Sequence, residues 1–181
     1  SFERPDGPQS IINAMCDHQA VWEAIRVGMV NPVLAEMPDD PVERAHHLKS
    51  FGYFQDASMV GVCALPQAAR LEKAYVNPRI AALAEDLQTR QVKSVAPGFD
   101  KIMADLKESM AATPGPVDTH THAIVFLYET PRAPSKGEPG TDWLNGATYH
   151  RSALLANETA AVIADYLRLY GVDARGHSAT T

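Results

Sequence analysis

Two histidines at the start of an apolar run are the residues whose type and spacing best suit catalysis. His120 and His122 are separated by one residue and precede Ala-Ile-Val-Phe-Leu. In a strand, residues i and i+2 point to the same face, so both rings can reach one metal ion, with Asp118, His177 or Cys63 as further ligands. No recognised ligand spacing accompanies them. We therefore expect two strand-end histidines bonded to loops or water, and rank a metallohydrolase site of His120, His122 and Asp118 as a weaker alternative.

The cysteines set a limit on redox chemistry. Cys16 and Cys63 are the only two, and no Cys-x-x-Cys run occurs. A four-iron cluster of the usual kind needs four thiolates, so this chain alone cannot build one. Cys63 has no Lys, Arg or His beside it and is expected to be buried. Glycine-rich phosphate loops and the Gly-x-Ser-x-Gly elbow of serine hydrolases are also absent.

Aromatic residues gather at Phe51, Tyr53 and Phe54. Such a group can line a pocket for a flat-ring cofactor, and these three are the candidate cofactor-binding residues. Packing of a helix-to-strand corner into the core is the interpretation we favour. His46 and His47 lie just before them, and adjacent helical positions diverge, so we expect one of the two to be exposed and the other packed.

Hydrophobic periodicity and capping residues predict helices that alternate with short strands. Asp40 is the candidate N-cap of the second helix, with Pro41 at its first position and Glu43 completing a capping-box pattern. The two central strands are almost wholly apolar, which favours cover on both faces. The pattern predicts a helix-flanked sheet, α/β or α+β. Its expected elements are helices over 9–30, 40–51, 77–92, 97–110 and 147–170, and strands over 58–65, 121–128 and 172–179.

Composition narrows the class of protein. The chain has 181 residues, 45% hydrophobic and 21% charged, which fits a single globular domain over 1–181. A net charge of −6 argues against nucleic acid as a partner, and no apolar run is long enough to span a membrane. Two cysteines and no signal peptide favour the cytoplasm. The chain begins at Ser1 rather than Met, so we expect a piece of a longer protein.

Four segments resemble parts of the catabolic, non-respiratory reductive dehalogenases. They are residues 46–63, where a helix runs into Val-Gly-Val-Cys; 118–129, Asp-Thr-His-Thr-His-Ala-Ile-Val-Phe-Leu-Tyr-Glu; 140–144, Gly-Thr-Asp-Trp-Leu; and 164–177, Ala-Asp-Tyr-Leu-Arg-Leu-Tyr-Gly-Val-Asp-Ala-Arg-Gly-His. The last is also similar, more distantly, to a segment of epoxyqueuosine reductase. Together they cover most of the chain from about residue 40 onward.

The resemblance implies a nitroreductase-like fold, because the corrinoid-binding domain of this family has one. Family members remove halide from halogenated organic compounds with cobalamin and two 4Fe-4S clusters. The cytoplasmic type carries an amino-terminal domain that looks like a degenerate copy of the corrinoid-binding domain, and this chain resembles that copy. No position here matches the family's catalytic tyrosine or its basic partner, so no catalytic residue is carried over.

The resemblance thus implies that this chain is the N-terminal scaffold module of a reductive dehalogenase, itself without cofactor. Its expected partners are the corrinoid-binding and ferredoxin-like domains of the parent protein, with a homodimer as a further option. The alternative is a free-standing flavin or small-molecule binding protein of nitroreductase-like fold. The halogenated substrate and the electron donor are not encoded in any motif found here.

Overall fold

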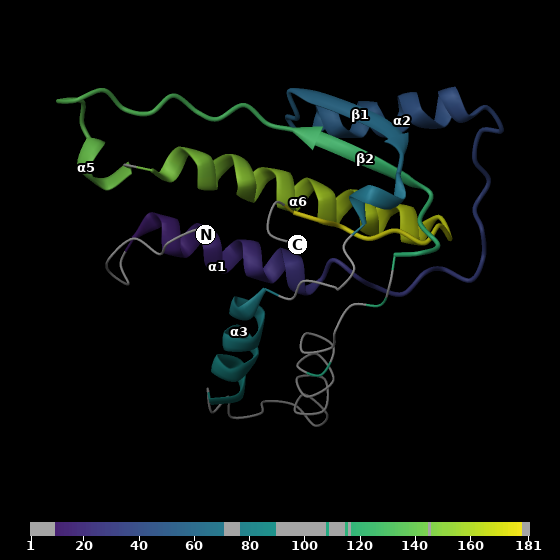
Figure 1. Cartoon of the computed structure of the whole chain (residues 1–181), viewed down its shortest axis with the longest axis horizontal. Coiled ribbons are helices and arrows are strands. Elements are labelled where there is room, and N and C mark those ends of the chain that lie inside the picture. Colours follow the sequence, from purple (N-terminus) through teal and green to yellow (C-terminus); the bar gives the residue numbers. More distant parts are fainter. Residues whose placement is uncertain are drawn as a thin grey trace.

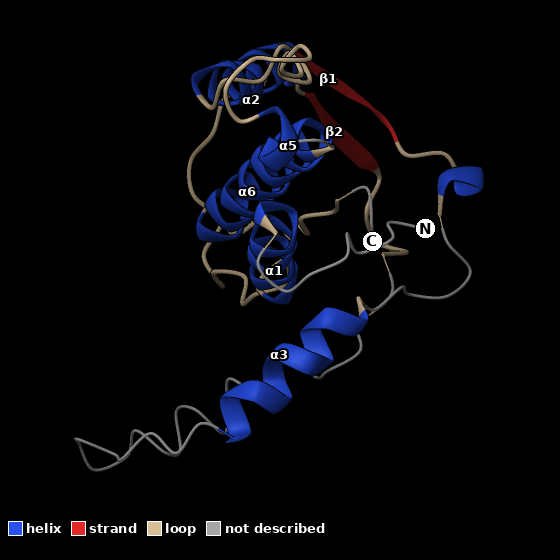
Figure 2. Cartoon of the chain, turned by 90° about the vertical axis from the view of Figure 1, so that its left-hand side faces the viewer, coloured by secondary structure: helices blue, strands red, loops and turns tan. Residues whose placement is uncertain are grey.

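The computed structural model describes residues 10–70, 77–89, 108, 115, 117–144 and 146–178. Its elements run in the order α1, α2, β1, a 3-10 turn, α3, β2, α5 and α6 (Figure 1). The helix expected over 97–110 lies outside the described residues except for Glu108. The class is α+β, as the sequence predicts, with a two-stranded sheet and helices on one side of it (Figure 2).

Helices α1 (Ile11–Ala24) and α6 (Ala147–Leu169) lie side by side at the centre of the molecule (Figure 1). Ser10 begins α1 by accepting a hydrogen bond from the Ile12 amide at 3.1 Å. The sequence predicted that this helix would continue to Val30, which is wrong. After Ala24 the Ile25 and Arg26 amides bond back to the Trp22 and Glu23 carbonyls, which tightens the last turn. The Arg26 carbonyl then accepts from the Gly176 amide and the Arg168 side chain.

Helix α2 (Pro41–Phe54) begins at the N-cap and proline that its sequence predicts, although the described structure has no capping-box bond between Asp40 and Glu43. Asp40 accepts a hydrogen bond from the Val42 amide at 2.9 Å, and Pro41 occupies the first helical position. The helix extends three residues beyond its predicted end at 51, through Gly52 to Phe54. Gly52 is needed there for close packing, because a Cβ at this position would lie 2.5 Å from Val60 Cγ2 and 2.9 Å from Phe126 Cδ1.

Strands β1 (Met59–Ala64) and β2 (His122–Leu127) pair antiparallel, with Met59 opposite Leu127 and Ala64 opposite His122. One face of the sheet, which carries Val60 and Phe126, packs on α2. The other face is open: Met59 is 62% exposed. The expectation that both strands are covered on both faces is therefore wrong for the described part of the chain. Within the described residues, helices cover one side of this small sheet (Figure 2).

The remaining elements are short or irregular. A 3-10 turn spans Gln67–Ala69, and the short helix α5 spans Thr141–Leu144. Helix α3 spans Pro78–Thr89, and the Asn77 side chain caps it by accepting a hydrogen bond from the Arg79 amide. Gly171 ends α6 with φ +84°, as expected for the glycine after a helix. Residues 172–178 form no strand, contrary to prediction. Their backbone bonds to side chains and loops instead, as when the Gly176 amide donates to the Arg26 carbonyl.

Candidate functional site

The histidines expected at the start of the second strand do not converge. His120 precedes β2 rather than lying in it, so the i, i+2 rule does not apply to the pair. Its Nε2 lies 3.2 Å from Asp173 Oδ2, whereas His122 is exposed and bonds to the Thr121 hydroxyl at 2.9 Å. Asp118 is turned to solvent beside Arg70. Within the described ranges, no group of three His, Cys, Asp or Glu side chains is placed to hold a metal ion.

The aromatic residues before β1 point in different directions. Phe51 packs on Tyr166 of α6, with ring centroids 4.8 Å apart. Tyr53 is 54% and Phe54 80% exposed. The structure therefore does not gather the three around one cavity, and their role in binding a cofactor stays a prediction. His47 contacts Phe51 and Tyr166, so the two histidines diverge as expected, but both His46 and His47 are exposed and the expectation that one of them is packed is wrong.

The contact between α2 and α6 is a polar-aromatic one. His47 Nε2 and the Tyr166 hydroxyl lie 3.0 Å apart, and the Tyr166 ring stacks at 4.8 Å on Tyr170. Burial raises the pKa of Tyr166 to about 12, aided by its hydrogen bond to Tyr170 and by the charge of that neighbour. Tyr166 therefore keeps its proton at neutral pH and cannot act there as a base.

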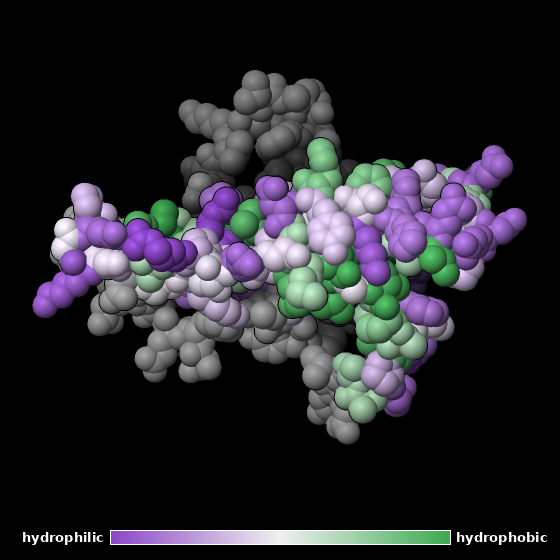
Figure 3. Space-filling model, turned by 90° about the horizontal axis from the view of Figure 1, so that it is seen from above, coloured by the Kyte–Doolittle hydropathy of each residue, from purple (hydrophilic) through white to green (hydrophobic). Residues whose placement is uncertain are grey.

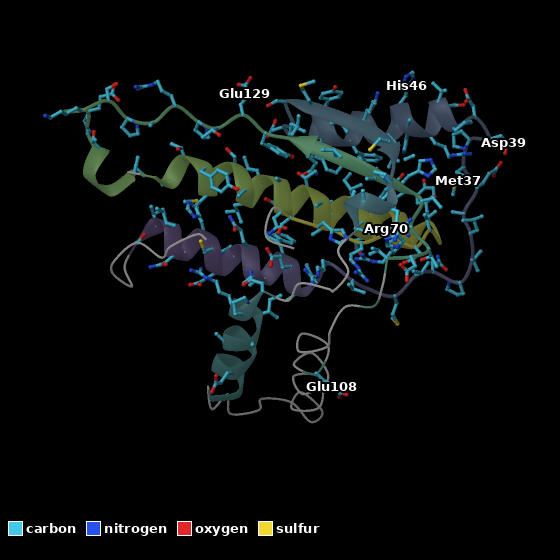
Figure 4. All side chains as sticks on the ribbon, in the orientation of Figure 1. Met37, Asp39, His46, Arg70, Glu108 and Glu129 are labelled. Carbon is cyan, nitrogen blue, oxygen red and sulfur yellow. The ribbon has the colours of Figure 1, made fainter. Side chains whose placement is uncertain are left out.

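Basic side chains gather around residues 172–178, and we call this group the basic cluster. One of its members, Arg70, is labelled in Figure 4. Its members are Arg26, Arg70, His120, Arg168, Arg175 and His177. The guanidinium groups bond mainly to backbone carbonyls. Arg70 donates to the carbonyls of Asp118 and His120, and Arg168 donates to those of Arg26 and Ala174. These bonds fasten loops together.

Within the basic cluster, His177 has the most perturbed acidity. Although part of its ring is exposed, the surrounding protein removes water from it, and Arg175, Arg26 and His120 add positive charge. Together they lower the pKa of His177 to about 4. The His177 ring is therefore neutral at pH 7.

In the His120–Asp173 pair, Thr119 donates a hydrogen bond to the Asp173 carboxylate rather than to the His120 ring. His120 and Asp173 thus correspond to the base and the orienting acid of a catalytic triad. Within the described structure, no nucleophile bonds to the His120 imidazole.

Sequence reasoning missed a buried carboxylate. Glu23 of α1 is 2% exposed and accepts hydrogen bonds from Asn77 Nδ2 and the Ser178 hydroxyl at 2.8 Å each, and from Asn157 Nδ2 at 3.4 Å. It thereby links α1 to the start of α3, to α6 and to the C-terminal segment. The available signal was a polar residue four positions after Gln19 on the packed face of α1.

Between α1 and α6 lies a hollow of about 240 Å³, with Arg168 and Asp165 on one side and Trp22 and Ile25 on the other. Small-molecule pockets usually measure roughly 300–1,000 Å³, so this one suits nothing as large as a corrinoid. Arg168 and Asp165 bond to each other at 3.1 Å and so satisfy part of their own polar groups.

None of the described helices is long and apolar enough to cross a membrane.

No protein-family model matches the chain, and no curated protein sequence matches it. Solved structures do. The chain is similar to catabolic reductive dehalogenase NpRdhA, with 27% identity and a TM-score of 0.62 over 93% of this chain and 18% of that one. Its complex with 3-bromo-4-hydroxybenzoic acid gives 28% identity and a TM-score of 0.63 over 94% and 18%. A reductive dehalogenase structure described as suggesting a mechanism for B12-dependent dehalogenation gives 27% and 0.62 over 93% and 18%.

The lopsided match, as we call it, covers very different shares of the two chains. It takes in nearly all of this chain, yet the chain spans less than a fifth of the dehalogenase chain in each of these three solved structures. The resemblance carried by residues 46–63, 118–129, 140–144 and 164–177 is therefore confirmed: over almost its whole length, this chain resembles one portion of the B12-dependent catabolic reductive dehalogenases.

Proposed function

We propose that this chain is the N-terminal scaffold module of a cytoplasmic reductive dehalogenase, and that cobalamin and iron–sulfur clusters are held by the rest of the same protein. The observation that carries the proposal is the lopsided match: 93–94% of this chain aligns with 18% of a dehalogenase chain. A free-standing flavin binder would not require that relation, so the similarity favours the module.

The donor atoms of the chain do not fit an iron–sulfur cluster. Cys16 lies on α1 and is half-buried, whereas Cys63 lies on β1 and is exposed. A 4Fe-4S cluster is held by four thiolates from closely spaced cysteines. Two thiols on different elements do not meet that need. The clusters of the proposed parent protein therefore require cysteines outside this sequence.

The chain's own contacts suit a rigid support. Buried polar side chains, Glu23 and Arg168 among them, join segments that are far apart in sequence. Satisfied polar networks of this kind fix one arrangement of the backbone. A support with fixed shape can orient a neighbouring catalytic domain without contributing a group to the reaction. The roles of catalytic acid, base and cofactor ligand would then fall to that neighbour.

The test begins with the native gene product, purified without air. We expect an intact mass well above 19.7 kDa, with cobalt and iron both bound. With reduced methyl viologen as electron donor, 3-bromo-4-hydroxybenzoic acid is the first substrate to try, since it is bound by a similar protein. Replacing C–Br by C–H takes two electrons and one proton and releases bromide. Bromide release that depends on bound cobalamin supports the proposal.

Two results would contradict it. One is a native product of 19.7 kDa with no cobalt. The other is a stoichiometric corrinoid or flavin spectrum from the 181-residue chain on its own, because the proposal assigns the cofactors to other parts of the protein. The spectrum also separates the module from the flavin-binding alternative.

A further inference from the structure

The open face of the sheet is apolar. This outer sheet face consists of Met59, Gly61 and Cys63 on β1 with Ala123, Val125 and Leu127 on β2, as the register requires. Leu127 is 53% and Val125 45% exposed, and none of the six residues carries a charge. Hydrophobic atoms gather where the sheet lies in Figure 3, with hydrophilic side chains to either side.

The strand sequences indicate that both sides of this sheet are meant to be covered. A sheet with one face in water alternates apolar and polar residues, whereas a sheet buried on both faces is apolar throughout. Residues 123–127 of β2 are Ala-Ile-Val-Phe-Leu, without a polar position. The inner residues, such as Phe126, pack on α2. Five of the six outer residues are exposed within the described structure, and Ala123 is half-buried. The sequence thus contains a face that none of the residues described in the structure covers.

Gly61 is a second and independent sign. It lies near the centre of the outer sheet face, and a Cβ built there meets no atom within 4 Å. The ladder runs without interruption from Met59 to Ala64, so no bulge requires a glycine, and its φ is not positive. Glycine in a regular strand weakens it, and one reason for its presence is close approach of another backbone. The space above Gly61 fits such an approach.

The size of the face favours a tethered occupant over a second copy. Six-residue strands rise about 3.4 Å per residue and lie about 4.8 Å apart, so the face measures roughly 20 by 10 Å. That area of about 200 Å² is far below the roughly 800 Å² per partner of a stable complex between separate chains. Within one polypeptide, the effective concentration is on the order of millimolar, and a small apolar face can suffice as the centre of a domain contact.

We propose that the outer sheet face docks on an apolar surface of the remaining polypeptide of the dehalogenase, with the partner's backbone passing over Gly61. This inference rests on the proposed function, because it needs the rest of that protein. The inference adds a defined contact surface to the proposed function, formed by Met59, Cys63, Val125 and Leu127.

Cys63 reports directly on the docking. In the native gene product, a pulse of iodoacetamide followed by mass spectrometry of the Cys63 peptide gives its alkylation rate. We expect a rate about 100-fold or more below that of a free thiol, since alkylation must wait for local opening. Val125→Arg should restore the fast rate by disrupting the contact. Val42→Arg is the matched control, because Val42 is 56% exposed on α2, away from this face, and should leave Cys63 protected.

A second variant keeps the test decisive where Val125→Arg does not fold. Gly61→Val should lower the melting temperature of the native product by several degrees, because the added side chain meets the partner. An open face predicts the opposite sign, since valine suits a strand better than glycine. Ala64→Val is the control on the same strand and opposite parity, where we expect a shift within about 1 °C because Ala64 is exposed.

The outcomes separate this inference from the proposed function. A long, cobalt-containing product whose Cys63 reacts like a free thiol, or whose Gly61→Val variant is unchanged or more stable, overturns the docking and leaves the module intact. Protection of Cys63 that is lost on dilution means that a second copy covers the face, which also overturns it. A short product without cobalt overturns both proposals.

Discussion

Replacing Glu23 tests whether the buried carboxylate holds the described fold together. Its oxygens accept two hydrogen bonds of 2.8 Å, from Asn77 and Ser178, and a longer one of 3.4 Å from Asn157. Hydrogen bonds to a charged group contribute about 1.5–3 kcal/mol each, and a buried donor left without a partner costs a similar amount. The two short bonds dominate. Because Asn77 and Ser178 are only partly buried, water can replace some of what is lost.

Glu23→Ala should therefore lower the free energy of unfolding by about 3–4 kcal/mol. The charge-removing variant Glu23→Gln keeps the shape but turns one acceptor into a donor, so we expect about 1–2 kcal/mol. Urea unfolding of the 181-residue chain, followed by circular dichroism, measures both. With an m-value of about 2 kcal/mol/M, the Glu23→Ala midpoint should fall by about 1.5–2 M.

Glu129→Gln serves as the control, since Glu129 is exposed after β2 (Figure 4) and should change stability by less than about 0.5 kcal/mol. A Glu23→Ala midpoint that moves no further than that of Glu129→Gln would refute the reasoning. It would mean that the network is formed but contributes nothing, with water serving the three donors equally well.

Three further predictions follow from local geometry. The NMR titration of His177 should have its midpoint near pH 4. The histidine of the unfolded chain takes up its proton at higher pH, near 6.5, so the free energy of unfolding should rise with pH between these two values, and His177→Asn should flatten that slope. Gly52→Ala should destabilise the chain in urea by about 1–2 kcal/mol, since the new methyl group lies 2.5 Å from Val60 Cγ2 and this overlap outweighs the helix-propensity gain of about 1 kcal/mol. Asp40→Ala should cost about 1 kcal/mol in the same assay because the Val42 amide loses its cap, and Asp39→Ala should cost less.

Features set by neighbours in sequence were predictable. The start of α2 follows from Asp40 and Pro41, which act on amides within one turn, and the end of α6 follows from Gly171. The separation of His46 from His47 follows from the helical repeat alone. In each case the physical cause lies within about four residues, so the sequence contains all of it.

Features set by distant partners were not predictable. The strand expected over 172–179 has suitable residues, but Arg168 and the Arg26 carbonyl take up its backbone groups. Near the end of α1, the Arg26 carbonyl likewise bonds to Arg168 of α6, a partner that is far away in sequence. The Glu23 network joins positions 23, 77, 157 and 178, and nothing in a single sequence says that these four meet. The pairing of His120 with Asp173 arises in the same way.

The strands fall between these two cases, and for a physical reason. Their positions were predicted to within one residue at each end, because β-branched and apolar runs are local. Their burial was not, because apolar composition states what environment a strand needs, whereas the described chain supplies it on one side only. A residue such as Val125 gains no stability from exposure to water, and an open apolar face with a central glycine favours association. The difference between what the strands require and what the described chain provides therefore identifies where a second layer of protein is expected to lie.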